Sequence, residues 1–397
     1  MLKREKYLSK IRGFYHTESL IKIIYGMRRS GKSVILTQII DEIKSQNIEN
    51  IIYINFESLK YDFIKNGKDL YNYIETLKVN NGKYYVFLDE IQKIENFEIG
   101  LNSLRITNDY SIFVTGSNSR MTLLELSTDL SGRYVSFRVN PLSFKEVVQI
   151  TNTKKSDYEK LLYKYFKWGG LPQSFMFENE IDKSNYLSSV YDSIILKDIV
   201  ERLGIKDIAS FNKVFQYILD TESREFSRDN VMSYLKKEHH EIANDTLYNY
   251  LEALTSTFIM NKVYRYDVHG KSILKTLNKF YSSDLGIKQI KTNSEEINYS
   301  VALENVVYND LISKNYKVFI GKTRKGEIDF IAIKNEKIKY IQVCLDLSNE
   351  KTRERKFSAF DEIDSKEKYV ISIDKNNYSN NEVKNINIFD FLMNDEF

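Results

Sequence analysis

The chain has 397 residues, which is too many for one ordinary hydrophobic core, so roughly two to four domains are expected. Apolar residues make up 42% and charged residues 28%, as in soluble globular proteins, and the net charge of +3 excludes a chain-wide basic field for nucleic acid. The single cysteine, Cys344, excludes an internal disulfide and a cysteine-rich zinc site. Because the charged N-terminus lacks a signal-peptide core and no apolar run approaches the roughly 18 residues of a membrane span, we expect a cytoplasmic protein without membrane contact.

In the first third of the chain, β-rich runs alternate with helical runs. Strands are predicted at residues 21–25, 51–56, 84–88 and 111–115, and helices at 34–40 and 69–77. The strands are nearly continuous apolar runs, which is typical of strands buried on both faces. We therefore expect an α/β fold with a parallel sheet covered by helices on both sides.

A segment with two glycines, Gly26 and Gly31, follows the first predicted strand. Residues 26–33 read Gly-Met-Arg-Arg-Ser-Gly-Lys-Ser and match the phosphate-binding pattern G-x-x-x-x-G-K-[ST]. The glycines allow several backbone N–H groups to point at phosphates, and the following helix adds its positive end. We expect Lys32 to reach the β- and γ-phosphates of ATP and Ser33 to ligate Mg²⁺. The other candidate ATP-binding residues of the loop are Gly26, Arg28, Arg29, Ser30 and Gly31, of which the two arginines could also face solvent.

The third predicted strand ends in two acidic residues, Asp89 and Glu90. Carboxylates in this position lie at the carboxyl edge of a parallel sheet, where ligands bind in such folds. We expect Asp89 to hold Mg²⁺ through water and Glu90 to orient and activate the attacking water.

Further catalytic candidates follow the fourth predicted strand. Thr115, Ser117 and Asn118 could sense the γ-phosphate, or they could form a Gly-Ser-Asn turn. Phosphoryl transfer also needs a cation on the γ-phosphate, and Arg133 is the first choice. Arg120 and Arg202 are alternatives, and any of the three could instead form a surface ion pair. An arginine supplied by a neighbouring chain would require a homo-oligomer.

Helical periodicity dominates residues 144–195, and a compact helical module is predicted at 205–271. Within that module, residues 228–237 and a helix capped by Asp245 predict a helix-turn-helix, and residues 263–267 a strand followed by a wing. Residues 239–261 contain no lysine or arginine. Phosphate contacts dominate affinity for DNA, so a recognition helix without cations is poorly suited to bind it alone. Sequence-specific DNA reading, weak nonspecific nucleic-acid contact and a protein-contact or packing role are the alternatives.

The last part of the chain alternates again. Glu304 is predicted on a helix, Glu327 and Asp329 on one strand, and Gln342 with Cys344 on the next. This spacing resembles the restriction-endonuclease-like fold, but Gln342 and Cys344 stand where a glutamate and a lysine would be needed for metal-dependent catalysis. A degenerate binding domain, a residual metal site and an active nuclease are the alternatives. Cys344 itself is expected to be a buried, inert thiol.

Several motifs together resemble one family, the archaeal and bacterial AAA-type ATPases with a C-terminal domain of the DUF4143 type, over nearly the whole chain. They are Ile24–Ser33, Leu88–Ile91, Val114–Ser119, Leu130–Arg133, Pro141–Phe144, Trp168–Pro172, Leu196–Ile199 and Tyr281–Gly286. The resemblance implies a P-loop NTPase core of the AAA+ type, a helical lid, a winged-helix module and a nuclease-like end. We place them at residues 1–145, 146–204, 205–272 and 273–397.

The predicted function is Mg²⁺-dependent ATP binding and hydrolysis that drives a conformational change of the C-terminal modules, where a protein partner or DNA would bind. One alternative is an ATP-binding interaction protein with negligible turnover. The other is an ATP-dependent DNA-acting protein with weak nuclease activity.

Overall fold

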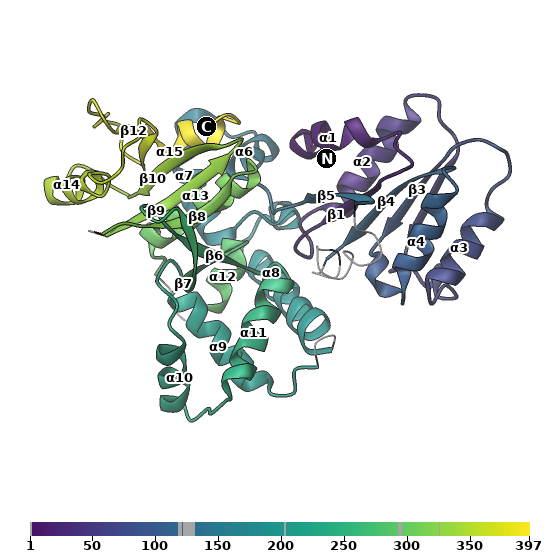
Figure 1. Ribbon diagram of the computed structural model, residues 1–397, viewed down its shortest axis with the longest axis horizontal. Coiled ribbons are helices and arrows are strands. Elements are labelled where there is room, and N and C mark those ends of the chain that lie inside the picture. Colours follow the sequence, from purple (N-terminus) through teal and green to yellow (C-terminus); the bar gives the residue numbers. More distant parts are fainter. Residues whose placement is uncertain (1, 118–120, 122–131, 202–203, 293–295, 325) are drawn as a thin grey trace. The chain divides into compact units, whose positions relative to one another are not determined.

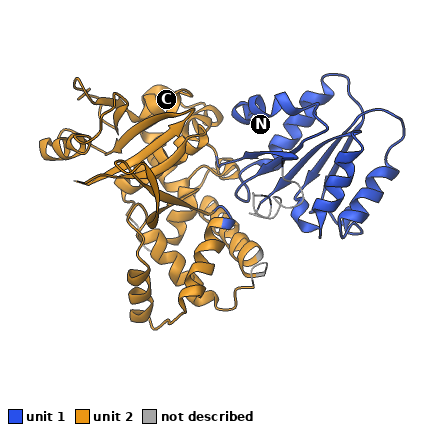
Figure 2. Cartoon of the chain, in the orientation of Figure 1, with its two compact units in different colours: residues 1–141, 256–258 blue, residues 142–255, 259–397 orange. Residues whose placement is uncertain are grey.

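The computed structural model describes residues 2–117, 121, 132–201, 204–292, 296–324 and 326–397. The chain divides into two compact units (Figure 2). The N-terminal unit comprises residues 1–141 and 256–258, and the C-terminal unit comprises residues 142–255 and 259–397. No helix in the described part of the chain combines the length and the apolar character of a membrane span.

The sheet of the N-terminal unit has five parallel strands in the order β2-β3-β4-β1-β5. The strands are β1 (Ile21–Tyr25), β2 (Ile51–Asn55), β3 (Tyr84–Asp89), β4 (Tyr110–Gly116) and β5 (Tyr134–Arg138). The four strands predicted in this region and their parallel arrangement are confirmed. Strand β4 lies between β1 and β3, so the carboxyl ends of the strands that carry the loop 26–33 and the acidic pair meet at one edge.

Helices cover both faces of this sheet (Figure 1). They are α1 (Glu5–Ile11), α2 (Lys32–Lys44), α3 (Gly67–Thr76) and α4 (Phe97–Ile106). Buried aliphatic residues of α1 and α2 pack with Phe87 and Phe113 on one face, whereas α3 and α4 pack against Val86 and Val114 on the other. Successive strand residues point to opposite faces, which explains why the strands are apolar along their whole length.

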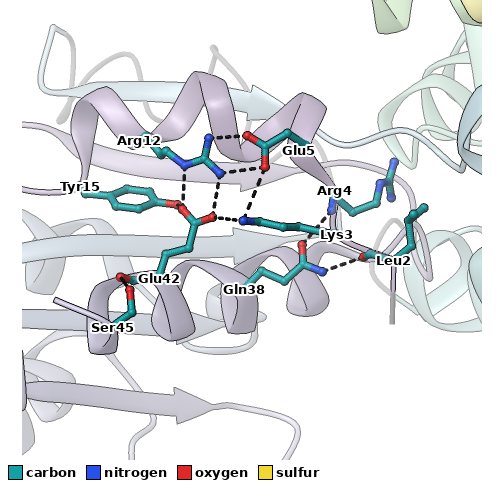
Figure 3. A network of polar contacts seen from close by, with 9 residues as sticks. All are labelled: Leu2, Lys3, Arg4, Glu5, Arg12, Tyr15, Gln38, Glu42 and Ser45. Atoms are coloured by element: carbon teal, nitrogen blue, oxygen red, sulfur yellow. Dashed lines mark hydrogen bonds and ion pairs between the residues drawn. The ribbon is translucent and has the colours of Figure 1, made fainter. Parts of the chain in front are cut away.

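A polar network fixes the N-terminal segment to α2 (Figure 3). Glu42 accepts hydrogen bonds from Arg12 Nη2 at 2.7 Å and from the Tyr15 hydroxyl at 2.9 Å, and Lys3 Nζ lies 2.9 Å from it. The hydrogen bond from Arg12 is the main cause that lowers the pKa of Glu42 to about 2. Gln38 accepts from Arg4 N–H at 3.0 Å. The segment before β1 is therefore anchored on the helix that follows the loop 26–33.

The C-terminal unit begins with helices and closes with a second sheet of seven strands. Its helices are α6 (Phe144–Thr151), α7 (Tyr158–Trp168), α8 (Glu180–Ser193), α9 (Ile208–Asp220), α10 (Arg228–Lys237), α11 (Asn244–Ser256), α12 (Leu285–Lys291), α13 (Tyr299–Ser313), α14 (Glu350–Ser358) and α15 (Ile388–Met393). Its strands are β6 (Met260–Asp267), β7 (Ser272–Ser282), β8 (Lys317–Lys322), β9 (Glu327–Lys334), β10 (Lys337–Val343), β11 (Lys368–Ser372) and β12 (Lys384–Asn387). The strand order is β12-β11-β10-β9-β8-β6-β7.

Two details of this unit differ from the expectations. Helix α11 begins at Asn244, so Asp245 lies in the first turn and is not the N-cap. The hairpin of β6 and β7 belongs to the seven-stranded sheet, because β6 pairs with β7 on one side and with β8 on the other. The boundary predicted between residues 272 and 273 therefore falls inside a hairpin.

Candidate functional site

The loop between β1 and α2 adopts a tightly curled conformation. Gly26 has a φ of 147°, and a Cβ at this position would lie 2.1 Å from the carbonyl oxygen of Val139. Gly31, the residue before α2, has a φ of 98°, and Arg29 also has a positive φ, 64°. These left-handed residues curl the loop around the N-terminus of α2. The N–H groups in the first turn of an α-helix have no acceptor within the helix, so the N-terminus of the 13-residue helix α2 favours an anion.

Lys32 and Ser33 lie beside the acidic pair at the end of β3. The Lys32 ammonium group is buried, donates to the carbonyl oxygen of Met27 at 3.1 Å and lies 3.8 Å from Glu90 Oε1. The Ser33 hydroxyl donates to Asp89 Oδ1 at 3.1 Å. A hydroxyl and a carboxylate in contact are the oxygen donors that Mg²⁺ prefers, so these residues fit a Mg²⁺–phosphate ligand.

Asp89 is fully buried among hydroxyl and amide donors. The Thr115 hydroxyl donates to Asp89 Oδ1, and the Tyr53 hydroxyl and the Asn55 amide donate to Asp89 Oδ2 at 3.2 and 3.4 Å. Burial raises the pKa of Asp89, and the hydrogen bonds from Thr115 and Ser33 oppose that shift. These donors fix the carboxylate in one orientation, as a metal-binding carboxylate requires.

Glu90 has a left-handed backbone conformation, with a φ of 55°. Its N–H donates to the Thr115 hydroxyl at 2.9 Å, so Thr115 contacts both acidic residues. Burial raises the pKa of Glu90, but the Lys32 ammonium and the hydrogen bonds from Gln92 and Ser117 outweigh it, and the pKa lies below its ordinary value. An ionised, buried carboxylate is the form that a general base needs.

The structure does not bring all predicted site residues together. Arg28 lies in the loop, and its Nη1 is 3.7 Å from Glu57. Arg133 precedes β5, and its backbone carbonyl accepts from Ile21 N–H at the amino end of β1. Arg138, at the other end of β5, pairs with Tyr25 beside the loop. At the rise of a β-strand, Arg133 lies about 16 Å from Arg138 along the strand.

Arg133 lies at the other edge of the sheet. Parallel strands put their carboxyl ends at one edge, so a residue before β5 lies at the edge opposite the loop 26–33. The Arg133 guanidinium lies 3.4 Å from Asn102 on α4. Arg133 as placed does not lie beside the loop 26–33 of its own chain. Asn118 and the alternative arginines, Arg120 and Arg202, lie outside the described residues.

Arg4 is a site residue that the sequence analysis missed. Its guanidinium is buried and donates from Nη1 to the carbonyl oxygen of Ser30 at 3.0 Å and from Nη2 to that of Asn140 at 3.2 Å. The N–H of Asn140 donates to the Tyr7 hydroxyl at 3.1 Å. The N-terminal segment thus stabilises the loop through hydrogen bonds to its backbone. These contacts join residues far apart in the sequence, so no local sequence pattern predicts them.

Replacing Arg4 tests that support. In Arg4→Met we expect ATP affinity to fall by about five-fold, because loss of the buried hydrogen bonds costs ~1 kcal/mol and loosens the loop. Titration calorimetry measures the affinity, and a thermal melt checks that the variant is folded. Lys44→Met, which also removes one cation but on the exposed last turn of α2, is the control. Equal affinities for all three proteins would contradict this role.

The predicted carboxylate cluster of the C-terminal unit contains a lysine. Lys279 on β7 forms an ion pair with Glu327 on β9 and lies 4.0 Å from Glu304 on α13. The Tyr281 hydroxyl donates to Glu304 at 2.6 Å. Burial is the main cause that raises the pKa of Glu304 to about 7, and Lys279 opposes it. The buried ammonium of Lys279 thus pairs with Glu327 and lies beside Glu304, so it faces two of the three carboxylates.

A second lysine occupies the other side of this cluster. Lys356 Nζ on α14 donates to Asp329 Oδ2 at 2.6 Å and to Gln342 Oε1 at 2.7 Å. In the described part of the chain, no three His, Cys, Asp or Glu residues are arranged to hold a metal ion. The ammonium groups of Lys279 and Lys356 already serve as counter-ions to the carboxylates. The residues of the cluster, as placed, therefore do not fit a divalent cation. Cys344 is buried, and burial raises the pKa of its thiol to about 12.

Comparisons with known proteins agree with the site in the N-terminal unit. The family model of an AAA domain matches residues 18–148. A domain of unknown function, DUF8612, matches residues 159–296. The DUF4143 type that the motifs resemble is not among these two matches, so it stays a prediction.

Relatives of known sequence match most of the chain. An uncharacterized protein of Haemophilus influenzae is 37% identical over 352 residues, which cover 87% of this chain and 88% of that protein. An uncharacterized protein of Methanocaldococcus jannaschii is 30% identical over 358 residues, which cover 86% of this chain and 78% of that protein. Among solved structures, the Walker-type ATPase of Pyrococcus abyssi gives a TM-score of 0.47 at 15% identity, covering 73% of this chain and 96% of that chain. The chain therefore belongs to the family that includes these Haemophilus and Methanocaldococcus relatives, and its residues 18–148 match the AAA domain.

Proposed function

We propose that this protein binds Mg·ATP at residues 26–33 and hydrolyses it to ADP and phosphate. The observation that carries the proposal is the meeting of three groups at one sheet edge: the phosphate-type loop, the Ser33–Asp89 contact of 3.1 Å and the buried Glu90 carboxylate. Nucleotide binding is also supported by the AAA-domain match.

In this proposal the backbone of the loop and the Lys32 ammonium bind the β- and γ-phosphates. Ser33 and Asp89 hold Mg²⁺, which neutralises charge on the phosphate oxygens when it is bound. Glu90 accepts a proton from the attacking water. Asn118 is the proposed γ-phosphate sensor, and Arg133 would supply its cation to a neighbouring chain in a homo-oligomer.

The energy of hydrolysis would be used to move the C-terminal unit, which we propose as the part that binds a protein partner or DNA. Nuclease activity is not part of the proposal, because Lys279 and Lys356 already pair with the carboxylates that a metal ion would need. An ATP-binding interaction protein with negligible turnover is the competing function, and steady-state phosphate release separates the two.

Lys32→Ala tests the nucleotide site itself. Loss of one charge-assisted contact to phosphate costs ~2 kcal/mol, so we expect ATP affinity to fall by about 30-fold and phosphate release with it. Competition with a fluorescent ATP analogue measures the affinity. Lys44→Met, on the same helix but exposed, should bind as the wild type does. Unchanged affinity in Lys32→Ala would place the nucleotide elsewhere.

A further inference from the structure

The two oxygens of the Glu90 carboxylate have different partners. Oε1 lies 3.8 Å from the Lys32 ammonium. Oε2 accepts from Gln92 Nε2 at 2.5 Å and from the Ser117 hydroxyl at 3.1 Å. Gln92 Nε2 also lies 3.2 Å from Ser117 Oγ, so these two side chains and Oε2 form one hydrogen-bonded triangle. The carboxylate is thus held at one oxygen by neutral donors and faces a cation at the other.

The backbone brings Gln92 back over Glu90. Glu90, at φ 55° and ψ 46°, ends β3 in a left-handed conformation, and a short 3₁₀ turn follows at Ile91–Lys93. Ile91 is fully buried, and Lys93 N–H donates to the Glu90 carbonyl at 3.2 Å, which closes the turn. A non-glycine residue in this region costs about 1 kcal/mol or more, and such strain is concentrated at functional sites. This turn places the Gln92 amide in contact with the Glu90 carboxylate.

We propose that Gln92 is a positioning residue for ATP hydrolysis, which holds Oε2 of Glu90 so that Oε1 is the oxygen presented to the attacking water. The inference rests on the proposed function. When Lys32 engages the phosphates, Oε1 becomes free to accept a proton from water. The water oxygen then forms a bond to the γ-phosphorus, the bond between that phosphorus and the bridging oxygen breaks, and ADP leaves with the electron pair.

Gln92→Met and the nearly isosteric Gln92→Glu test the proposal in the full-length chain with Mg·ATP. We expect kcat to fall by about ten-fold in Gln92→Met and further in Gln92→Glu, because misplacing a general base forfeits part of its effect. ATP affinity should stay within about two-fold of wild type, because the hydrogen bonds of Gln92 run to Glu90 and Ser117. Gln149→Met, the same change at an exposed position of α6, should leave both quantities unchanged.

The outcomes separate the two proposals. A lower kcat at unchanged ATP affinity in both folded Gln92 variants supports the positioning role, since a general structural defect would also weaken ATP binding. A wild-type kcat in either variant contradicts the role of Gln92 and leaves the proposed function standing. A wild-type protein that binds ATP without releasing phosphate contradicts both.

Discussion

Glu90→Gln is expected to bind ATP as the wild type does and to release phosphate about 1000-fold more slowly. The amide keeps the size of the carboxylate and can still accept from Gln92 and Ser117, so the pocket is preserved. It cannot take a proton from water at neutral pH, and a general base contributes roughly 10²–10⁴-fold to such a reaction. Single-turnover phosphate release and equilibrium nucleotide binding measure the two quantities separately.

Glu95→Gln is the matched control for this change. Glu95 follows the same turn and is exposed, so its replacement removes one negative charge near the site without touching the pocket. It should hydrolyse ATP at the wild-type rate. If Glu90→Gln also hydrolyses at that rate, Glu90 is not the base and another group must activate water.

The largest stability effect is expected for Asp284, at the start of α12. Its carboxylate is buried and accepts from Gly170 N–H at 2.7 Å and from Ile287 N–H at 3.1 Å. It therefore joins the segment after α7 to the N-terminus of α12. Asp284→Ala leaves these buried donors without their acceptor, and we expect the unfolding free energy of the C-terminal unit to fall by about 3 kcal/mol.

Urea denaturation followed by tryptophan fluorescence measures this change. The chain has one tryptophan, Trp168, which lies two residues before Gly170, so the signal reports on the segment that Asp284 holds. Asn349→Ala removes an exposed N-cap of α14 and should cost only about 1 kcal/mol. Equal losses in the two variants would show that the buried carboxylate contributes no more than an ordinary cap.

Asp284 also predicts a pH dependence. Burial raises the pKa of Asp284 to about 6, above the value near 3.9 of an unfolded aspartate, although the surrounding N–H groups oppose the shift. Between these pH values the folded state binds more protons, so this contribution to stability falls as pH rises from about 4 to about 6. The unfolding free energy of the wild type minus that of Asp284→Asn should decrease over this range. A constant or increasing difference would contradict the shift.

The parts of the site that could be predicted depend on local sequence. The loop 26–33 needs glycine at fixed offsets, and the strand that ends in Asp89 and Glu90 is a continuous apolar run. Four of the five strands of the sheet follow from such apolar runs, whereas β5, which is only partly buried, was not predicted.

The remaining features depend on geometry that no local pattern encodes. Arg133 was assigned from a short motif, but its distance from the loop depends on the register of β5 against β1. The contact of Gln92 depends on the left-handed conformation of Glu90, which a β-strand pattern does not predict. The strand with Gln342 and Cys344 lacks the lysine that the nuclease pattern would place there. Lys356 supplies a cation to Asp329 instead, from 27 residues away in the sequence, so the spacing of the motif could not reveal it.

The nucleotide site of residues 26–33 is tested most directly by titration calorimetry of the full-length protein with a non-hydrolysable ATP analogue and Mg²⁺. We predict saturable binding of one nucleotide per chain, with an affinity that weakens in Lys32→Ala and is unaffected in Lys44→Met. Absence of binding by the wild type at millimolar nucleotide, or equal binding by all three proteins, would contradict the account.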